Sequence, residues 1–123
     1  MEKIKLFEGE LKLMELLWER EGSSAKELSL IASERIGWNK NTTYTVIKKL
    51  VEKGVIKRSE PGFICHSLIN REEVGLEEAK EVLNSFFRGS VRALFSSFMS
   101  DGTLSSKEVD ELRKLIDEHE RKG

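Results

Sequence analysis

Hydrophobic residues in the first part of the chain recur every three or four positions, which is the spacing of amphipathic α-helices. The first predicted helix extends from about Glu8 to Arg20, and Gly22 is predicted to cap its C-terminal end. The apolar stripe of this helix is predicted to contain Leu11, Met14, Leu17 and Trp18. A second helix is predicted to begin at a capping box formed by Ser24 and Glu27. Its inner face comprises Leu28, Ile31, Ala32 and Ile36.

A third helix is predicted between the N-cap Asn39 and the C-terminal pair Lys53-Gly54, and it has two different faces. The positions with core-facing spacing are Thr43, Val46, Ile47, Leu50 and Val51. The opposite face contains Asn41, Tyr44, Thr45, Lys48 and Glu52. Solvated helix faces are usually rich in Glu, Lys, Arg and Gln, whereas Asn, Thr, Tyr and Lys form hydrogen bonds with base edges and phosphates in a DNA groove. The pattern therefore favours a DNA-recognition helix over a solvated helix of a small all-α protein.

The segment after Gly54 predicts two short β-strands, over residues 55–59 and 63–68, joined by a Pro-Gly turn. Three helices followed by a hairpin is the order of a winged helix-turn-helix domain. In that fold the third helix enters the major groove and the hairpin touches the flanking DNA backbone. Cys65 and His66 alternate along the second strand, so their side chains should point to opposite faces and should not share a metal site.

Residues 70–123 are predicted to form three further helices with narrow apolar stripes. The predicted helices are Glu72–Phe87, Ser90–Met99 and one that follows a capping box at Ser105–Glu108. So short a segment is not expected to build a separate core. The stripes must then be covered by the first domain or by a second copy of the chain, and a second copy is the simpler cover. A homodimer also places two recognition helices on a two-fold DNA site. The predicted dimerisation residues are Val82, Phe86, Phe87, Val91, Leu94, Phe95, Phe98, Leu112, Leu115 and Ile116.

These patterns predict a mainly α protein with one small β-hairpin. We expect a winged-helix DNA-binding domain over residues 1–69 and a helical dimerisation region over residues 70–123. The hydrophobic fraction of 38% and the charged fraction of 35% are typical of a soluble, helix-rich protein. No apolar run approaches the about 18 residues of a membrane span, and the N-terminus lacks the apolar core of a signal peptide, so we expect a cytoplasmic protein.

The sequence contains few of the residue patterns that indicate a catalytic or metal-binding site. Cys65 is the single cysteine, which excludes a disulfide or a cysteine cluster within one chain. The sequence contains no glycine-rich phosphate loop and no spacing that indicates a Ser/His/Asp or Cys/His set. We therefore expect neither enzymatic activity nor a cofactor or metal.

The charge is distributed unevenly along the chain. The net charge is −1, yet residues 39–58 contain six Lys or Arg residues and a single Glu, a local net charge of +5. A nucleic-acid-binding protein needs such a local basic surface rather than a basic total. Tyr44, the sole tyrosine, is predicted to meet DNA, with packing along its own helix as the alternative. The predicted DNA-contacting residues are Asn39, Lys40, Asn41, Thr42, Tyr44, Thr45, Lys48, Lys49, Lys57 and Arg58.

Several longer motifs occur in a fixed order along nearly the whole chain. They are Glu10–Trp18 (E-x-x-x-M-x-x-L-W), Ser24–Leu28, Trp38–Thr45, Lys49–Ile56, Phe87–Val91, Leu94–Phe98 and Leu104–Val109. In these motifs the chain resembles the penicillinase repressor family of winged-helix repressors (BlaI/MecI/CopY type). The resemblance implies a homodimeric transcriptional repressor that occupies a palindromic operator on double-stranded DNA, with the C-terminal helices forming the dimer.

The resemblance also implies a route of release for some family members. In the antibiotic-resistance members a membrane-bound sensor–protease pathway leads to cleavage of the repressor, at the position that matches Ser97 and Phe98. This chain has Ser97 where those members have Asn, its hairpin turn lacks a basic tip, and the C-terminal cysteine cluster of the copper-responsive members is absent. The alternative function is a winged-helix module that contacts only other proteins and does not recognise DNA.

Overall fold

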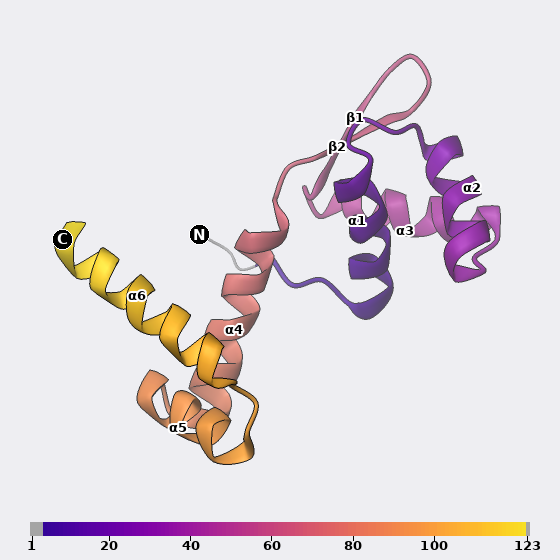
Figure 1. Ribbon diagram of the computed structural model, residues 1–123. Helices are drawn as coiled ribbons and strands as arrows, with labels where there is room; N and C mark the ends of the chain where they lie inside the picture. The colour runs from indigo at the N-terminus through magenta and orange to yellow at the C-terminus, as the bar shows by residue number, and fades with distance from the viewer. Residues whose placement is uncertain (1–3, 123) are drawn as a thin grey trace. The chain divides into compact units, whose positions relative to one another are not determined.

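The computed structural model describes residues 4–122, and over that range the chain forms six α-helices and one two-stranded β-hairpin (Figure 1). The elements are α1 (Glu8–Glu19), α2 (Ala25–Ile36), α3 (Lys40–Glu52), β1 (Ile56–Ser59), β2 (Ile64–Ser67), α4 (Arg71–Phe87), α5 (Val91–Asp101) and α6 (Ser106–Lys122). The predicted fold class, a winged helix followed by a helical region, is confirmed. The chain divides into two compact units between Glu78 and Ala79, within α4. The functional boundary predicted after residue 69 stays a prediction.

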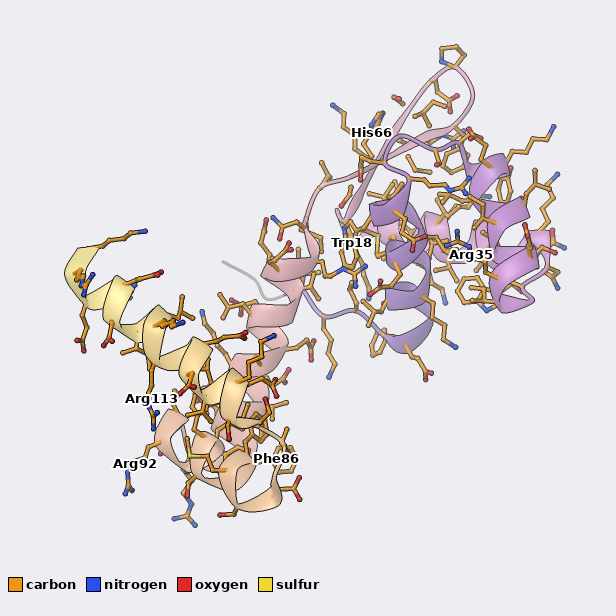
Figure 2. The ribbon with its side chains drawn as sticks, in the orientation of Figure 1. Trp18, Arg35, His66, Phe86, Arg92 and Arg113 are labelled. Atoms are coloured by element: carbon orange, nitrogen blue, oxygen red, sulfur yellow. The ribbon has the colours of Figure 1, made fainter. Side chains whose placement is uncertain are left out.

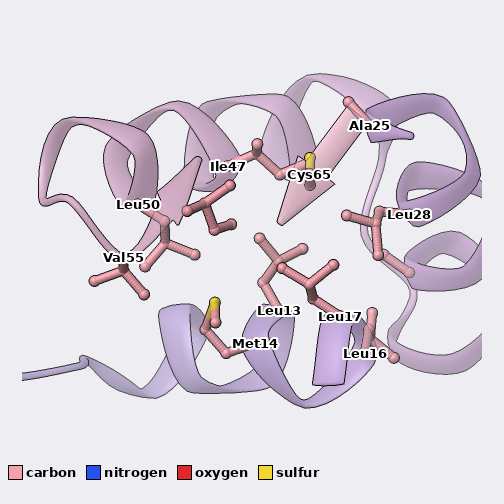
Figure 3. Close-up of a cluster of buried hydrophobic side chains, with 12 residues drawn as sticks. Leu13, Met14, Leu16, Leu17, Ala25, Leu28, Ile47, Leu50, Val55 and Cys65 are labelled. Carbon is pink, nitrogen blue, oxygen red and sulfur yellow. The ribbon is translucent and has the colours of Figure 1, made fainter. Parts of the chain in front are cut away.

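The first unit packs α1, α2, α3 and the hairpin around one hydrophobic core (Figure 3). Its core residues are Leu13, Met14, Leu16, Leu17, Ala25, Leu28, Ala32, Ile47, Leu50, Val55, Ile56 and Cys65. The predicted stripe of α1 was wrong at Leu11, which is 39% exposed, whereas Leu13 and Leu16 are buried. The reason is that α1 contacts α2, α3 and β2 together, so its buried face is wider than a single stripe.

Helix boundaries follow the local capping signals at α2 and α3. The backbone N–H of Glu27 donates to Ser24 Oγ and the N–H of Ser24 donates to Glu27 Oε1, each at 3.1 Å, which confirms the predicted capping box. Gly37 ends α2 in the left-handed conformation, with φ of 68°. The predicted cap of α1 was wrong, because the C-cap is Arg20. The Arg20 carbonyl accepts hydrogen bonds from the backbone N–H and the hydroxyl of Ser23, which close a turn through Glu21 and Gly22.

The hairpin is antiparallel, with Ile56 opposite Ser67 and Ser59 opposite Ile64, and its loop extends away from the three helices (Figure 1). Backbone hydrogen bonds attach its second strand to the start of α2: Ala25 N–H donates to Phe63 O at 2.9 Å, and Cys65 N–H donates to Ser23 O at 2.8 Å. The position of the hairpin relative to α2 is therefore fixed by the backbone.

Trp18 connects α1 to the chain that leaves the hairpin (Figure 2). Its indole N–H lies 3.0 Å from both Ser67 Oγ and Ile69 O. Cys65 is buried, and burial raises the pKa of its thiol to about 11. His66, on the opposite face of the strand, is hydrogen-bonded to Ser59 Oγ at 3.0 Å, so the predicted opposition of these two side chains is confirmed.

The second unit comprises the end of α4 together with α5 and α6. The capping box before α6 is confirmed by two hydrogen bonds of 3.0 and 3.1 Å between Ser105 and Glu108. Helix α5 continues two residues beyond the predicted end at Met99, and Gly102 caps it with φ of 79°. Among the described residues, none of the helices has the length and apolar character needed to cross a membrane.

Candidate nucleic-acid interface

The orientation of α3 is fixed by its N-terminal cap and by its buried face. Asn39 Oδ1 accepts a hydrogen bond from the Thr42 N–H at 2.8 Å, and the Thr43 hydroxyl donates to the Asn39 carbonyl at 3.1 Å. Thr43, Ile47 and Leu50 are buried, and Val46 and Val51 pack partly buried against the core, so the predicted inner face is confirmed. Asn39, one of the predicted DNA contacts, already uses its side-chain oxygen as the cap.

Most of the opposite face of α3 is exposed to solvent. Its exposed residues are Lys40, Asn41, Thr42, Thr45, Lys48, Lys49 and Glu52. The Thr45 hydroxyl donates its hydrogen to the Asn41 carbonyl at 2.8 Å, and while this bond is kept the hydroxyl can serve DNA only as an acceptor. The Asn41 amide has no hydrogen-bond partner among the residues that the structure describes, and an amide of this kind can bond with both edge atoms of an adenine.

Tyr44 is only partly exposed, because its ring packs against the hairpin. The Tyr44 and Phe63 rings meet edge to face, with centroids 6.0 Å apart and an interplanar angle of 89°. The ammonium group of Lys40 lies 5.7 Å from the centroid of the Tyr44 ring. Tyr44 thus joins α3 to the hairpin. The sequence had predicted either contact with DNA or packing along its own helix, and contact with the hairpin was not predicted.

Phe63 was not among the residues predicted to form the interface. This residue adopts a positive φ of 50° at the end of the hairpin turn. Its ring lies 3.6 Å from the guanidinium carbon of Arg58, and Arg58 Nε donates to Glu60 Oε1 at 2.5 Å. Arg58 is therefore held by a neighbouring carboxylate, whereas Lys57, which is also exposed, has no ion-pair partner among the described residues.

Lys53, at the end of the basic segment, has a structural partner. Its ammonium group donates to Glu10 Oε1 at 2.6 Å and to the Lys5 carbonyl at 3.2 Å. Burial raises the pKa of Glu10, but the hydrogen bonds from Lys53 and from the Phe7 backbone outweigh it and leave the pKa below its usual value. Two of the six cations in the segment, Lys53 and Arg58, are thus neutralised by carboxylates. The remaining cations are Lys40, Lys48, Lys49 and Lys57.

The predicted dimerisation residues lie on exposed or partly exposed surfaces of α4, α5 and α6. Those with the largest exposure are Val82, Phe86, Val91, Leu115 and Ile116, and Figure 2 labels Phe86 on α4. Phe95 and Phe98 pack edge to face with centroids 6.5 Å apart. Ser97 lies within α5, where its hydroxyl donates to the Ala93 carbonyl at 3.0 Å. Cleavage beside Ser97 would therefore require local unwinding of the helix.

Comparison with known proteins gives one family along nearly the whole chain. The model of the penicillinase repressor family matches residues 7–118. The chain is 26% identical to the penicillinase repressor of Bacillus licheniformis, with 99% of this chain and 98% of the relative covered. It is 26% identical to the penicillinase repressor of Staphylococcus aureus, with 98% and 97% covered. The methicillin resistance regulatory protein MecI of Staphylococcus aureus strain N315 is also 26% identical, with 87% and 89% covered.

Proposed function

The chain belongs to the penicillinase repressor family, and we propose that it represses transcription as a homodimer bound to a palindromic operator. Its family and its winged-helix fold make it a DNA-binding transcriptional repressor. The dimeric state, the symmetry of the operator and the contact residues are the parts that we propose. In the proposed mechanism the bound dimer occupies the promoter and denies it to RNA polymerase.

The observation on which the proposal depends is the exposed polar face of α3. Asn41 and Thr45 offer hydrogen-bonding groups at positions where a solvated helix would present longer charged side chains. Both stand on a helix whose opposite face is fixed in the core by Ile47 and Leu50. A rigid helix of this kind can place its side chains against base edges with little loss of conformational entropy.

Four lysines that form no ion pair within residues 4–122 supply the proposed phosphate contacts. Lys40, Lys48 and Lys49 are on α3 and Lys57 is on β1. Each phosphate neutralised on duplex DNA changes the slope of log K against log salt by about −0.9, because condensed counterions are released. These lysines should therefore contribute to affinity for all sequences, whereas Asn41 and Thr45 should contribute to the choice of sequence.

The exposed apolar side chains of α4, α5 and α6 support the homodimer. Large apolar side chains left exposed often mark an interface, and Phe86, Leu115 and Ile116 are 78%, 61% and 56% exposed. A two-fold dimer would present two copies of α3 to half-sites separated by about 34 Å, one turn of DNA. A symmetric operator is the matching partner for such a pair.

The proposal is tested by measuring fluorescence anisotropy on an operator selected from random duplexes and on an unrelated duplex, at several salt concentrations. Lys48→Ala should weaken both complexes and reduce the salt slope by about one. Asn41→Ala or Thr45→Ala should lower the preference for the operator by about tenfold, because a good base contact contributes about 1–3 kcal/mol of discrimination. Lys114→Ala, on α6 and exposed, removes the same charge and serves as the control.

Two results would contradict this function. Equal losses on both duplexes for all three α3 variants would exclude base recognition by this face. Absence of salt-dependent binding to any duplex would favour the protein-contact module instead.

We also propose α5 as the segment whose cleavage releases the repressor, in a sensor–protease pathway. The support is the family membership alone. Ser97 and Phe98 lie within α5, so this helix would have to unwind locally before it is cut. Mass spectrometry of the protein from cells exposed to an inducing antibiotic should then detect a fragment that ends at Ser97. An intact chain in fully induced cells would contradict the cleavage and leave the DNA-binding proposal unaffected.

A further inference from the structure

Four side chains form a continuous cluster between the hairpin and the exposed face of α3: Tyr44, Arg58, Glu60 and Phe63. The Tyr44 ring packs edge to face on the Phe63 ring, and the Arg58 guanidinium carbon lies 3.6 Å from the centroid of the Phe63 ring. Arg58 Nε also donates to Glu60 Oε1 at 2.5 Å. Arg58, one of the two cations of the hairpin, is therefore held between an aromatic ring and a carboxylate.

Glu60 uses both of its oxygens within the hairpin. Oε2 accepts a hydrogen bond from the Phe63 backbone N–H at 3.1 Å, while Oε1 binds Arg58. The Phe63 backbone N–H and the Arg58 guanidinium lower the pKa of Glu60 below its usual value, which keeps the carboxylate charged at neutral pH. The side chains of Arg58 and Glu60 are 45% and 55% exposed, so both charges remain accessible to a ligand.

The position of this carboxylate matters for DNA. In winged-helix complexes the hairpin lies beside the phosphate backbone, and a negative charge there opposes the phosphates. A guanidinium paired with a carboxylate also releases fewer of the cations condensed on DNA than a free one, because the pair brings no net positive charge to the phosphates. Arg58 should thus contribute far less to binding than its place in the basic segment indicates.

We propose that Glu60 limits the affinity of the repressor for DNA by neutralising Arg58, so that the phosphate contact of the hairpin is only partly used. This inference rests on the proposed DNA-binding function and adds to it a residue that sets affinity. In the alternative role, Glu60 orients Arg58 toward a phosphate and so increases the affinity for DNA. The two roles predict opposite signs when the charge of Glu60 is removed.

Glu60→Gln is the informative variant, because its amide oxygen can still accept a hydrogen bond from Arg58 or from the Phe63 N–H. We expect the affinity for operator and for unrelated duplex to rise together, by about fivefold at moderate salt, and the salt slope to steepen by about one. Glu118→Gln, an exposed residue of α6, makes the same change of charge elsewhere and should leave both quantities nearly unchanged.

A double-mutant cycle assigns the effect to the pair. Arg58→Ala should change the affinity of the natural chain by less than about twofold, but it should remove the gain when combined with Glu60→Gln. Anisotropy at several salt concentrations gives the affinities and slopes, and thermal melting verifies that every variant is folded.

Unchanged or weaker binding by folded Glu60→Gln, with the natural chain still binding duplex DNA, would overturn this inference alone. A gain that persists after Arg58→Ala would also overturn it, since Glu60 would then act independently of Arg58. Failure of the natural chain to bind any duplex would overturn both the inference and the proposed function.

Discussion

The two compact units of this protein differ in where they place their apolar side chains. In the first unit, twelve hydrophobic residues from three helices and the hairpin form one buried cluster. In the second unit no described side chain is buried, and Phe86, Val91, Met99, Leu115 and Ile116 are each more than half exposed. A helix hydrophobic along one face gains stability only when that face is covered. The first unit covers most of its own apolar faces, although Phe7 and Leu30 are each 63% exposed, whereas the described part of the second unit leaves its apolar faces uncovered.

The same difference separates two kinds of function. Recognition of bases needs side chains held within a fraction of an ångström, and the core beneath α3 provides that rigidity. Dimerisation needs an apolar surface that stays available until a second copy arrives, and α4, α5 and α6 present one. Each unit is thus suited to one half of the proposed repressor, and the following changes test that division.

The largest effect is expected from Leu17→Ala, in the core of the first unit. Leu17 is fully buried, so its truncation leaves a cavity and should lower the free energy of unfolding by about 2–5 kcal/mol. Urea unfolding followed by circular dichroism measures the change. Leu112→Ala, in α6 and only partly buried, removes the same atoms and should cost much less in dilute, monomeric protein. Equal losses for the two variants would erase the distinction between the units.

Phe86→Glu should act on association rather than on folding. Phe86 is 78% exposed, so a charge there meets water in the monomer but would be desolvated in a dimer interface. We expect the dissociation constant of the dimer to rise by about a hundredfold, equivalent to about 2.7 kcal/mol. Sedimentation at several concentrations measures it. Glu118→Gln serves as the surface control, and an unchanged dissociation constant would place the interface elsewhere.

Much of the fold could be predicted from the sequence, because its signals are local. The capping boxes at Ser24 and Ser105, the Asn39 cap and the Pro-Gly turn each depend on residues within a few positions of one another. The two faces of α3 follow from spacing alone. The width of the buried face of α1 could not be predicted from spacing, because it depends on contacts with α2, α3 and β2, which lie later in the sequence.

The electrostatics of the candidate interface were the least predictable part. Lys53 and Arg58 belong to the basic segment, yet each is paired with a carboxylate. The partner of Lys53 lies 43 positions away in the sequence. Glu60, the partner of Arg58, is only two positions away in the sequence. The contact of Arg58 with the Phe63 ring, however, accompanies a positive φ at Phe63, which the residue type does not indicate. A count of charges along a segment therefore overestimates the cations available to DNA.

The smallest and sharpest comparison uses two capping boxes of nearly identical geometry, one in each unit. Ser24 and Ser105 each accept a backbone hydrogen bond at 3.1 Å from a glutamate three residues later. Ser24→Ala should lower the free energy of unfolding by about 1 kcal/mol, because α2 is part of the cooperative core of the first unit.

Ser105→Ala removes an equivalent cap from α6, whose ends are anchored to no buried cluster. Its cost should appear as fraying of α6, visible as faster amide exchange there, with little change in the urea midpoint of the first unit. An equal shift of that midpoint by both variants would mean that the two units unfold as one, and the apolar surface of α4, α5 and α6 could then not be treated as independent of the core.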